Sequence, residues 1–147
     1  LLACWKRSPA GCGAKRMVMN LREIEVFRPY GNELPEELLW AENMAEAAVE
    51  RWLSAEMVRI AKRQTQTLGM YAMDRGDGET YILHGVVVAP AWRKQGLGRW
   101  LVGHAIGVAE SKGGRHVSFP GSQARRFLAN VGFVAAGNSQ RFDLIQE

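Results

Sequence analysis

The chain has 147 residues, 47% of them hydrophobic, which is enough for one domain with a sizeable core. No apolar run approaches the ~20 residues that cross a membrane, so we expect no membrane partner. Four of the 19 cations lie in the first sixteen residues, where there is no acid, and the other 15 equal the 15 acids. The net charge of +4 therefore gives no argument for a nucleic acid partner.

The first segment, Leu1–Arg16, has no apolar periodicity and holds both cysteines, Cys4 and Cys12. No histidine lies near this pair, so its spacing is not a zinc pattern, and we predict no metal. We expect residues 1–16 to be a disordered extension or an expression remnant that precedes a domain at 17–147. That domain has no cysteine, which excludes a thiol nucleophile, and we expect it to be cytoplasmic.

In chain order, alternating apolar residues predict a first strand over Glu23–Arg28. Pro35 is well placed to open a helix that continues at helical spacing to about Ser54, with Trp40 and Trp52 on a similar face. Met57–Arg63 and Thr67–Asp74 predict a hairpin. The Gly-Asp-Gly sequence at 76–78 predicts a second turn, before a strand over Tyr81–Val88 that we expect to be the longest and most buried.

The remaining elements alternate between helix and strand. A helix from Gly98 should turn Leu101, Ala105, Val108 and Ala109 inward and end at Gly113. The further predicted elements are a strand at Arg115–Phe119, a helix from Ser122 to Val131, and strands at Phe133–Ala136 and Arg141–Ile145. This order predicts a single α/β domain, a mixed central β-sheet of about 6–7 strands flanked by about 3–4 helices.

The loop between the buried strand and the next helix is the most informative segment. It contains Arg93, Lys94 and Arg99 around Gly96 and Gly98. Glycines let backbone N–H groups converge on an anion, and the first turn of a helix adds N–H groups that have no intrahelical acceptor. The spacing is neither that of a Walker loop nor that of a dinucleotide fingerprint. The loop therefore predicts a pyrophosphate site of another kind.

Two sequence blocks resemble the GNAT superfamily of N-acetyltransferases. Val86-x-Val88-x-Pro90-x-x-Arg93-x-x-Gly96-x-Gly98 is similar to its acetyl-coenzyme A signature, and Ala124-x-x-Phe127-Leu128-x-x-x-Gly132-Phe133 looks like its late helix and following turn. The resemblance implies acetyl-coenzyme A as co-substrate, with strand backbone holding the pantetheine arm and the loop holding the pyrophosphate. The implied cofactor-binding residues are Val86, Val87, Val88, Arg93, Lys94, Gln95, Gly96, Leu97, Gly98 and Arg99.

The candidate general base is His84. Family members often place a glutamate on this strand, but here Ile82 stands at about that position. His84 follows two residues later, on the same face of a strand, and an imidazole suits proton removal near neutral pH. The alternative is a buried histidine with a structural hydrogen bond. His104, within the helix after the loop, and His116, within a strand, are expected to have such structural roles.

The general acid is where the chain departs from the family. The motif's tyrosine, whose hydroxyl faces the departing thiolate, is Leu128 here, and Gly121 replaces an asparagine before the helix. Tyr71, Tyr81 and Ser122 are the side chains that could compensate. General acid catalysis contributes about 10²–10⁴-fold, so its absence slows transfer without forbidding it.

These features predict an acyltransferase that moves an acetyl group from acetyl-coenzyme A to a primary amine of a small molecule or protein. The alternative is a catalytically idle acyl-coenzyme A-binding regulator of a partner protein, which Leu128 and Gly121 favour. A general phosphate- or nucleic-acid-binding module fits less well, because the charges balance after Met17. The sequence leaves the acceptor amine and a homodimer open.

Overall fold

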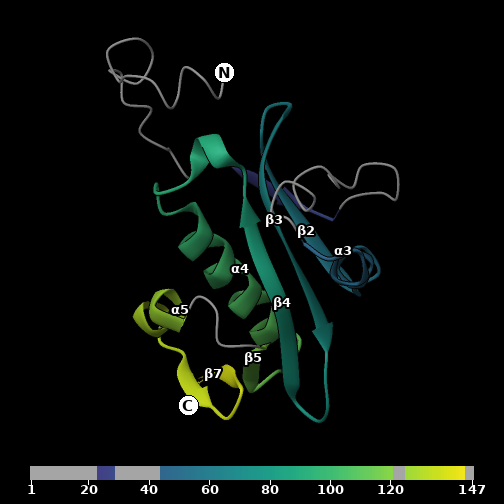
Figure 1. Ribbon diagram of the computed structural model, residues 1–147, viewed down its shortest axis with the longest axis vertical. Coiled ribbons are helices and arrows are strands. Elements are labelled where there is room, and N and C mark those ends of the chain that lie inside the picture. The colour runs from purple at the N-terminus through teal and green to yellow at the C-terminus, as the bar shows by residue number, and fades with distance from the viewer. Residues whose placement is uncertain (1–22, 29–43, 121–124, 145–147) are drawn as a thin grey trace.

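The computed structural model describes residues 23–28, 44–120 and 125–144 (Figure 1). One seven-stranded sheet has the order β1-β2-β3-β4-β5-β7-β6. Neighbouring strands are antiparallel except for β4 and β5, which are parallel. The strands are β1 (Glu25–Phe27), β2 (Met57–Arg63), β3 (Gln66–Arg75), β4 (Thr80–Val88), β5 (His116–Pro120), β6 (Val134–Ala136) and β7 (Ser139–Asp143).

Three α-helices accompany the sheet in the described ranges, and a 3₁₀ turn at Pro90–Trp92 precedes the second of them. The helices are α3 (Glu46–Leu53), α4 (Leu97–Ser111) and α5 (Arg125–Val131). This arrangement confirms the predicted fold class and element order. Among these helices, none has the length and apolar character needed to span a membrane. Residues 1–16, the helix start at Pro35, Trp40, Gly121 and Ser122 lie outside the described residues.

The prediction that Tyr81–Val88 would be the longest and most buried strand is wrong. β3 has 10 residues and six consecutive buried positions, whereas β4 has 9 residues and alternates between buried and half-buried positions. The reason is position in the sheet. From Gly69 to Met73, β3 pairs with β2 on one side and with β4 on the other, while β4 loses its second neighbour after three residues.

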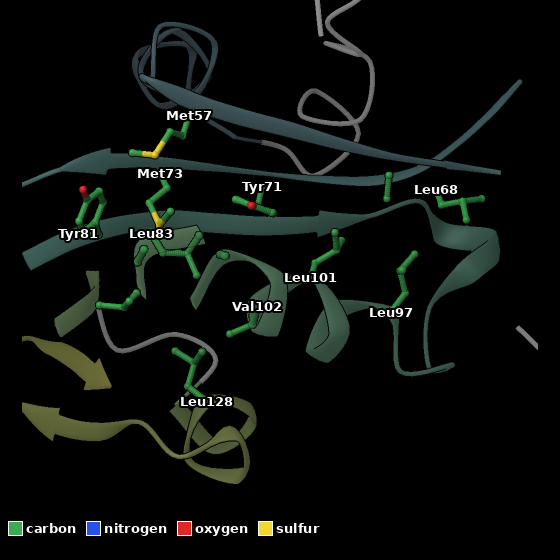
Figure 2. Close-up of a cluster of buried hydrophobic side chains, with 14 of the residues drawn as sticks. Met57, Leu68, Tyr71, Met73, Tyr81, Leu83, Leu97, Leu101, Val102 and Leu128 are labelled. Carbon is green, nitrogen blue, oxygen red and sulfur yellow. The ribbon is translucent and has the colours of Figure 1, made fainter. Parts of the chain in front are cut away.

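The two faces of the sheet carry different helices (Figure 1). On one face, Val49 and Trp52 of α3 pack with Ile60, Met70 and Val87 in a smaller core cluster. On the other face, α4 covers the larger cluster, part of which Figure 2 shows between helix and sheet. The fully buried residues of α4 are Leu97, Leu101, Val102, Ala105 and Ala109, and the half-buried Val108 packs against the same cluster. The predicted inward face is therefore confirmed, and Val102, which was not predicted, belongs to it as well.

An irregularity in β4 lies at the candidate base. Ala72 pairs with Gly85 and Met73 pairs with Leu83, so His84 is an extra residue without a partner on β3. Such a bulge bends a strand and redirects its side chains, and bulges are common beside active sites. Gly85 is required next to it, because a Cβ there would lie 2.6 Å from Cζ2 of Trp52. α3 therefore packs directly against the irregular part of β4.

Candidate active site

β4 and β5 separate in the middle of the sheet. Their parallel pairing consists of three residue pairs and ends at Ile82 and Ser118, although β4 continues to Val88. From Leu83 onward, β3 is therefore the strand partner of β4 in the described structure, on one edge alone. The other edge of β4 presents backbone groups that a ligand can use.

The direction of those groups follows from one hydrogen bond. The N–H of Ala89 donates to the carbonyl of Leu68 on β3 at 2.8 Å. In a strand, the N–H and C=O of one residue point to the same edge, and those of the next residue point to the other edge. Since Ala89 points to β3, the backbone groups of Val88 and Val86 point away from it. The Val88 carbonyl accepts a bond of 3.0 Å from Nε of Arg93. The backbone of Val86 is thus directed to the free edge, where the predicted pantetheine contacts belong.

The loop after β4 enters α4 through two residues in left-handed conformation, Lys94 with φ of 62° and Gly96 with φ of 85°. Gly96 is the N-cap of α4 and makes no side-chain cap, and the first turn contains no acidic residue. The N–H groups of Leu97, Gly98 and Arg99 accordingly point out of the helix end without an intrahelical acceptor. This is a cradle for an anion, because the positive end of the helix dipole lies there as well.

The three cations of the loop do not play equivalent parts. Arg93, predicted as a phosphate contact, has Nε bonded to the Val88 carbonyl, so it braces the loop against the end of β4. Lys94 and Arg99 are exposed, and neither forms an ion pair with the described residues. Lys94 and Arg99 are therefore the side chains available to charged phosphate oxygens.

Gln95 supplies a further sign of a ligand at this loop. Both its Nε2 and Oε1 atoms are enclosed, and neither has a hydrogen-bond partner in the described structure. A buried amide without partners is costly, at about 1–3 kcal/mol for each polar group, and such groups are rare in native proteins. The exposed cations, the uncapped helix end and this amide together fit a coenzyme with a pyrophosphate and an amide-bearing arm.

A helix distant in sequence completes the loop's surroundings. A Cβ built on Gly98 would lie 3.7 Å from Cγ2 of Val88 and 3.8 Å from Cζ of Phe127. Phe127, on α5, is 38% exposed and therefore lies at the surface beside both the start of α4 and the end of β4. The second sequence block is thus brought next to the first.

Both tyrosines considered for the general acid are hydrogen-bonded to other side chains. Leu128 is fully buried in the larger core cluster (Figure 2) and offers no proton. The Tyr71 hydroxyl bonds to Nδ1 of His104 at 2.8 Å, and the Tyr81 hydroxyl accepts a bond of 2.9 Å from the guanidinium of Arg75. The Tyr71 hydroxyl is therefore engaged by His104, whereas the Tyr81 hydroxyl keeps its proton but lies at the start of β4, the end of this strand opposite to the loop.

His84, the candidate base, has a partner that the sequence did not indicate. Its Nε2 lies 2.8 Å from Oδ2 of Asp74, and 14% of the His84 side chain is exposed. The other carboxylate oxygen, Oδ1, accepts the backbone N–H of Glu56 at 2.8 Å. Asp74 lies on β3 opposite Ile82. The register between β3 and β4 would therefore have been needed to predict Asp74 as the partner of His84.

A cavity of about 590 Å³ lies apart from the loop, lined by Arg28, Glu56, Met57, Arg75, Tyr81 and Lys112. Tyr81 lies at the start of β4, and Lys112 follows the last turn of α4. The loop instead joins the end of β4 to the start of α4. This cavity is therefore not part of the predicted coenzyme site. The described residues also contain no cluster of ligands that could hold a metal ion.

Comparison with known proteins agrees with this geometry. The model of the "Acetyltransferase (GNAT) family" matches residues 17–133. A GNAT family acetyltransferase from Elizabethkingia anophelis, solved with acetyl-CoA bound, is 17% identical with a TM-score of 0.71, over 83% of this chain and 99% of that one. No curated protein sequence matches the chain.

Two further solved structures share the fold. IAA acetyltransferase from Bacillus cereus ATCC 14579 is 17% identical with a TM-score of 0.68, over 82% of this chain and 99% of that one. An aminoglycoside 6'-N-acetyltransferase complexed with coenzyme A is 16% identical with a TM-score of 0.68, over 84% and 98%. The match of the family model over most of the sequence, together with this fold, shows that the chain belongs to the acetyltransferase (GNAT) family.

Proposed function

We propose that this protein transfers the acetyl group of acetyl-coenzyme A to a primary amine of a small molecule or a protein. The observation that carries the proposal is the uncapped, acid-free N-terminus of α4, which a short loop joins to a strand whose second edge has no strand partner beyond Ile82 among the described residues. A pyrophosphate and a peptide-like arm need these two features side by side.

In this proposal the first-turn amides of α4 hold the pyrophosphate, with Lys94 and Arg99 as the charged contacts. The free backbone groups of Val86 hold the arm, as an added strand would, and Gln95 gains the hydrogen-bond partners that it lacks. The coenzyme supplies the acetyl thioester. Fixing that group beside the amine contributes most to the rate, since good positioning supplies ~7–11 kcal/mol of barrier reduction.

The chemical step is attack of the neutral amine nitrogen on the thioester carbonyl. The new C–N bond forms, the C–S bond breaks, and the amine proton passes to His84, the group in the described site best suited to be the base. The departing thiol has a pKa of ~8.5 by analogy with cysteine, so the thiolate leaves tolerably without a general acid. That property makes Leu128 compatible with turnover.

A second function is kept because of one observation. Leu128 is a completely buried aliphatic residue where the family motif has a tyrosine, and the two other tyrosines considered are hydrogen-bonded elsewhere. A protein that binds acyl-coenzyme A and regulates a partner without catalysis would show this pattern. Thiol release from acetyl-coenzyme A, measured with a panel of small amines and lysine peptides, separates the two functions. Amine-dependent release supports the transferase, and binding without release supports the regulator.

The coenzyme site itself is tested with Gly96→Val. A β-branched residue at φ of 85° costs about 1–2 kcal/mol in stability and distorts the cradle. Gly113→Val is the matched control, because Gly113 has the same φ of 85°, no neighbour within 4 Å and a place at the opposite end of α4. By calorimetry, Gly96→Val should lose coenzyme A affinity at least 10-fold, while Gly113→Val should keep it despite a similar loss of stability.

The affinity for coenzyme A and its fragments should also decrease as phosphate groups are removed from the ligand. Wild type should bind coenzyme A most tightly, dephospho-coenzyme A less tightly and pantetheine least, because each lost phosphate removes charge-assisted hydrogen bonds. Equal affinity of wild type and Gly96→Val for coenzyme A would place the coenzyme elsewhere.

A further inference from the structure

The inference concerns Asp74, which lies on β3 beside the candidate base. We propose that Asp74 is a positioning residue that holds the imidazole of His84 in the tautomer whose Nδ1 accepts the amine proton. The proposal rests on the proposed acetyl transfer and names one more residue that this transfer needs.

Both oxygens of Asp74 are engaged, which fixes its carboxylate in one orientation. Oδ1 accepts the N–H of Glu56 at 2.8 Å, and Oδ2 lies 2.8 Å from Nε2 of His84. The N–H of Glu56 belongs to the backbone just before β2, so this contact does not depend on a flexible side chain. The carboxylate is therefore a rigid acceptor for the histidine.

The tautomer of His84 follows from this acceptor. An ionised carboxylate offers no proton, so the short contact with Oδ2 requires that Nε2 carry the hydrogen. In a neutral imidazole the other nitrogen, Nδ1, then has a free lone pair. The arrangement is the base-and-orienter pair of general acid–base catalysis, with Nδ1 as the working atom.

The position of His84 along β4 suits this role. It lies two residues beyond Ile82, where pairing with β5 ends, and it is the extra residue of the bulge. The four residue-to-residue steps from His84 to Val88 span about 13 Å of strand, which is comparable with an extended pantetheine arm. An arm anchored at the start of α4 and laid along β4 thus ends near His84.

The proton balance is complete with these groups. As the amine nitrogen forms its bond to the carbonyl carbon, its proton moves to Nδ1 of His84, and the electron pair of the broken C–S bond leaves on sulfur. The imidazolium is stabilised by the adjacent Asp74 carboxylate. The proton then passes from Nδ1 to solvent, to which the side chain is partly open.

The test is Asp74→Asn, which keeps the shape and inverts the hydrogen bond. The N–H of Glu56 needs an acceptor, so the amide oxygen takes the place of Oδ1 and the amide NH₂ faces Nε2 of His84. Nε2 must then accept, the hydrogen moves to Nδ1, and the base is lost. We expect kcat to fall about 10²–10⁴-fold, with KM for acetyl-coenzyme A and melting temperature nearly unchanged.

A second readout does not depend on activity. Nitrogen-15 NMR of the imidazole at about pH 8, above the ordinary histidine range, distinguishes hydrogen on Nε2 from hydrogen on Nδ1. Wild type should show Nε2–H and Asp74→Asn should show Nδ1–H. Asp77→Asn is the matched control, since it removes the same charge in the turn before β4, and it should change neither kcat nor the tautomer.

The outcomes separate this inference from the proposed function. A kcat of Asp74→Asn within twofold of wild type, or an unchanged tautomer, overturns the positioning role. A loss of kcat that is matched by a loss of coenzyme affinity and melting temperature also overturns it, because Asp74 would then be structural. If wild type transfers acetyl to no amine, the proposed function fails and so does the catalytic part, while NMR still decides whether Asp74 sets the tautomer.

Discussion

Leu128 shows how a single side chain can set the chemistry available to a site. It is fully buried in the larger core cluster, with Val102 of α4 among its members (Figure 2). An aliphatic residue there contributes about 1.5–3 kcal/mol of burial energy and no proton donor. The protein therefore has a well-packed core at a position where the family motif places a hydroxyl.

Leu128→Tyr should raise kcat and lower stability together. A phenol hydroxyl near the departing thiolate should increase kcat by about 10-fold, below the full range for a general acid because the site is packed around leucine. The larger side chain should lower the free energy of unfolding by about 1–3 kcal/mol. Steady-state kinetics and denaturant unfolding measure the two effects.

Leu128→Phe is the control for this substitution, since it adds the ring without the hydroxyl. Phenylalanine should reproduce the loss of stability without the gain in kcat. An equal gain with Leu128→Phe would mean that packing, not proton donation, limits the rate.

At the scale of elements, a buried polar pair joins α4 to β3. The hydroxyl of Tyr71 and Nδ1 of His104 are 2.8 Å apart. Burial raises the pKa of Tyr71, so the phenol stays protonated and donates this hydrogen bond. The pKa of His104 is lowered, chiefly by burial and secondarily by the charge of Arg59, so the imidazole is held neutral as the acceptor. The pair fixes the helix whose N-terminus forms the proposed anion cradle.

This pair should make stability depend on pH. Because the pKa of His104 lies below its ordinary 6.5 in the folded state, the unfolded chain binds more protons as pH falls through that value. The stabilisation is therefore present above about pH 6.5 and is lost as pH falls further. His104→Asn keeps an acceptor for Tyr71 and does not titrate, so its free energy of unfolding should fall less than that of wild type between pH 8 and pH 5.

Denaturant unfolding at several pH values measures that difference. His116→Asn is a useful control, since the His116 side chain is 39% exposed and its Nδ1 contacts Asp143 of β7 at 2.7 Å, not a residue of α4. Parallel pH curves for wild type and His104→Asn would show that His104 does not titrate differently on folding.

At the scale of the whole molecule, one sheet both forms the core and provides the strand edge of the proposed coenzyme site. Its central strands, β2 to β4, form the core between α3 and α4, and its second half, β5 to β7, remains attached to β4 by three residue pairs (Figure 1). Because the attachment is confined to the start of β4, the end of this strand has an edge next to the loop and α4 that no other described strand pairs with. The coenzyme site proposed here is a consequence of that limited pairing.

Removal of Leu1–Arg16 should leave the domain intact. The family match begins at residue 17, and the segment before it has no periodic apolar face to bury, so ordering it would cost entropy with little return. The truncated protein should keep its melting temperature and its coenzyme A affinity, as measured by calorimetry. A loss of several degrees would mean that the segment packs on the domain.

Local sequence determined much of this protein. Hydrophobic periodicity predicted α4 and the strands around it, because one buried face imposes a period of 3.6 or 2 on any chain. Glycine spacing predicted the loop, since a left-handed residue such as Gly96 is needed to enter the helix from the strand. The lack of a hydroxyl at position 128 could also be predicted, because the residue type at a motif position is given by the sequence itself.

Tertiary structure alone decided the rest. Asp74 meets His84 across a hairpin and through a bulge, and neither the register nor the extra residue follows from local propensity. Likewise, the end of β4–β5 pairing at Ile82 depends on how two strands joined by α4 diverge. Local composition determines which elements form, but contacts between distant elements determine which polar atoms meet, and the chemistry proposed here depends on those contacts.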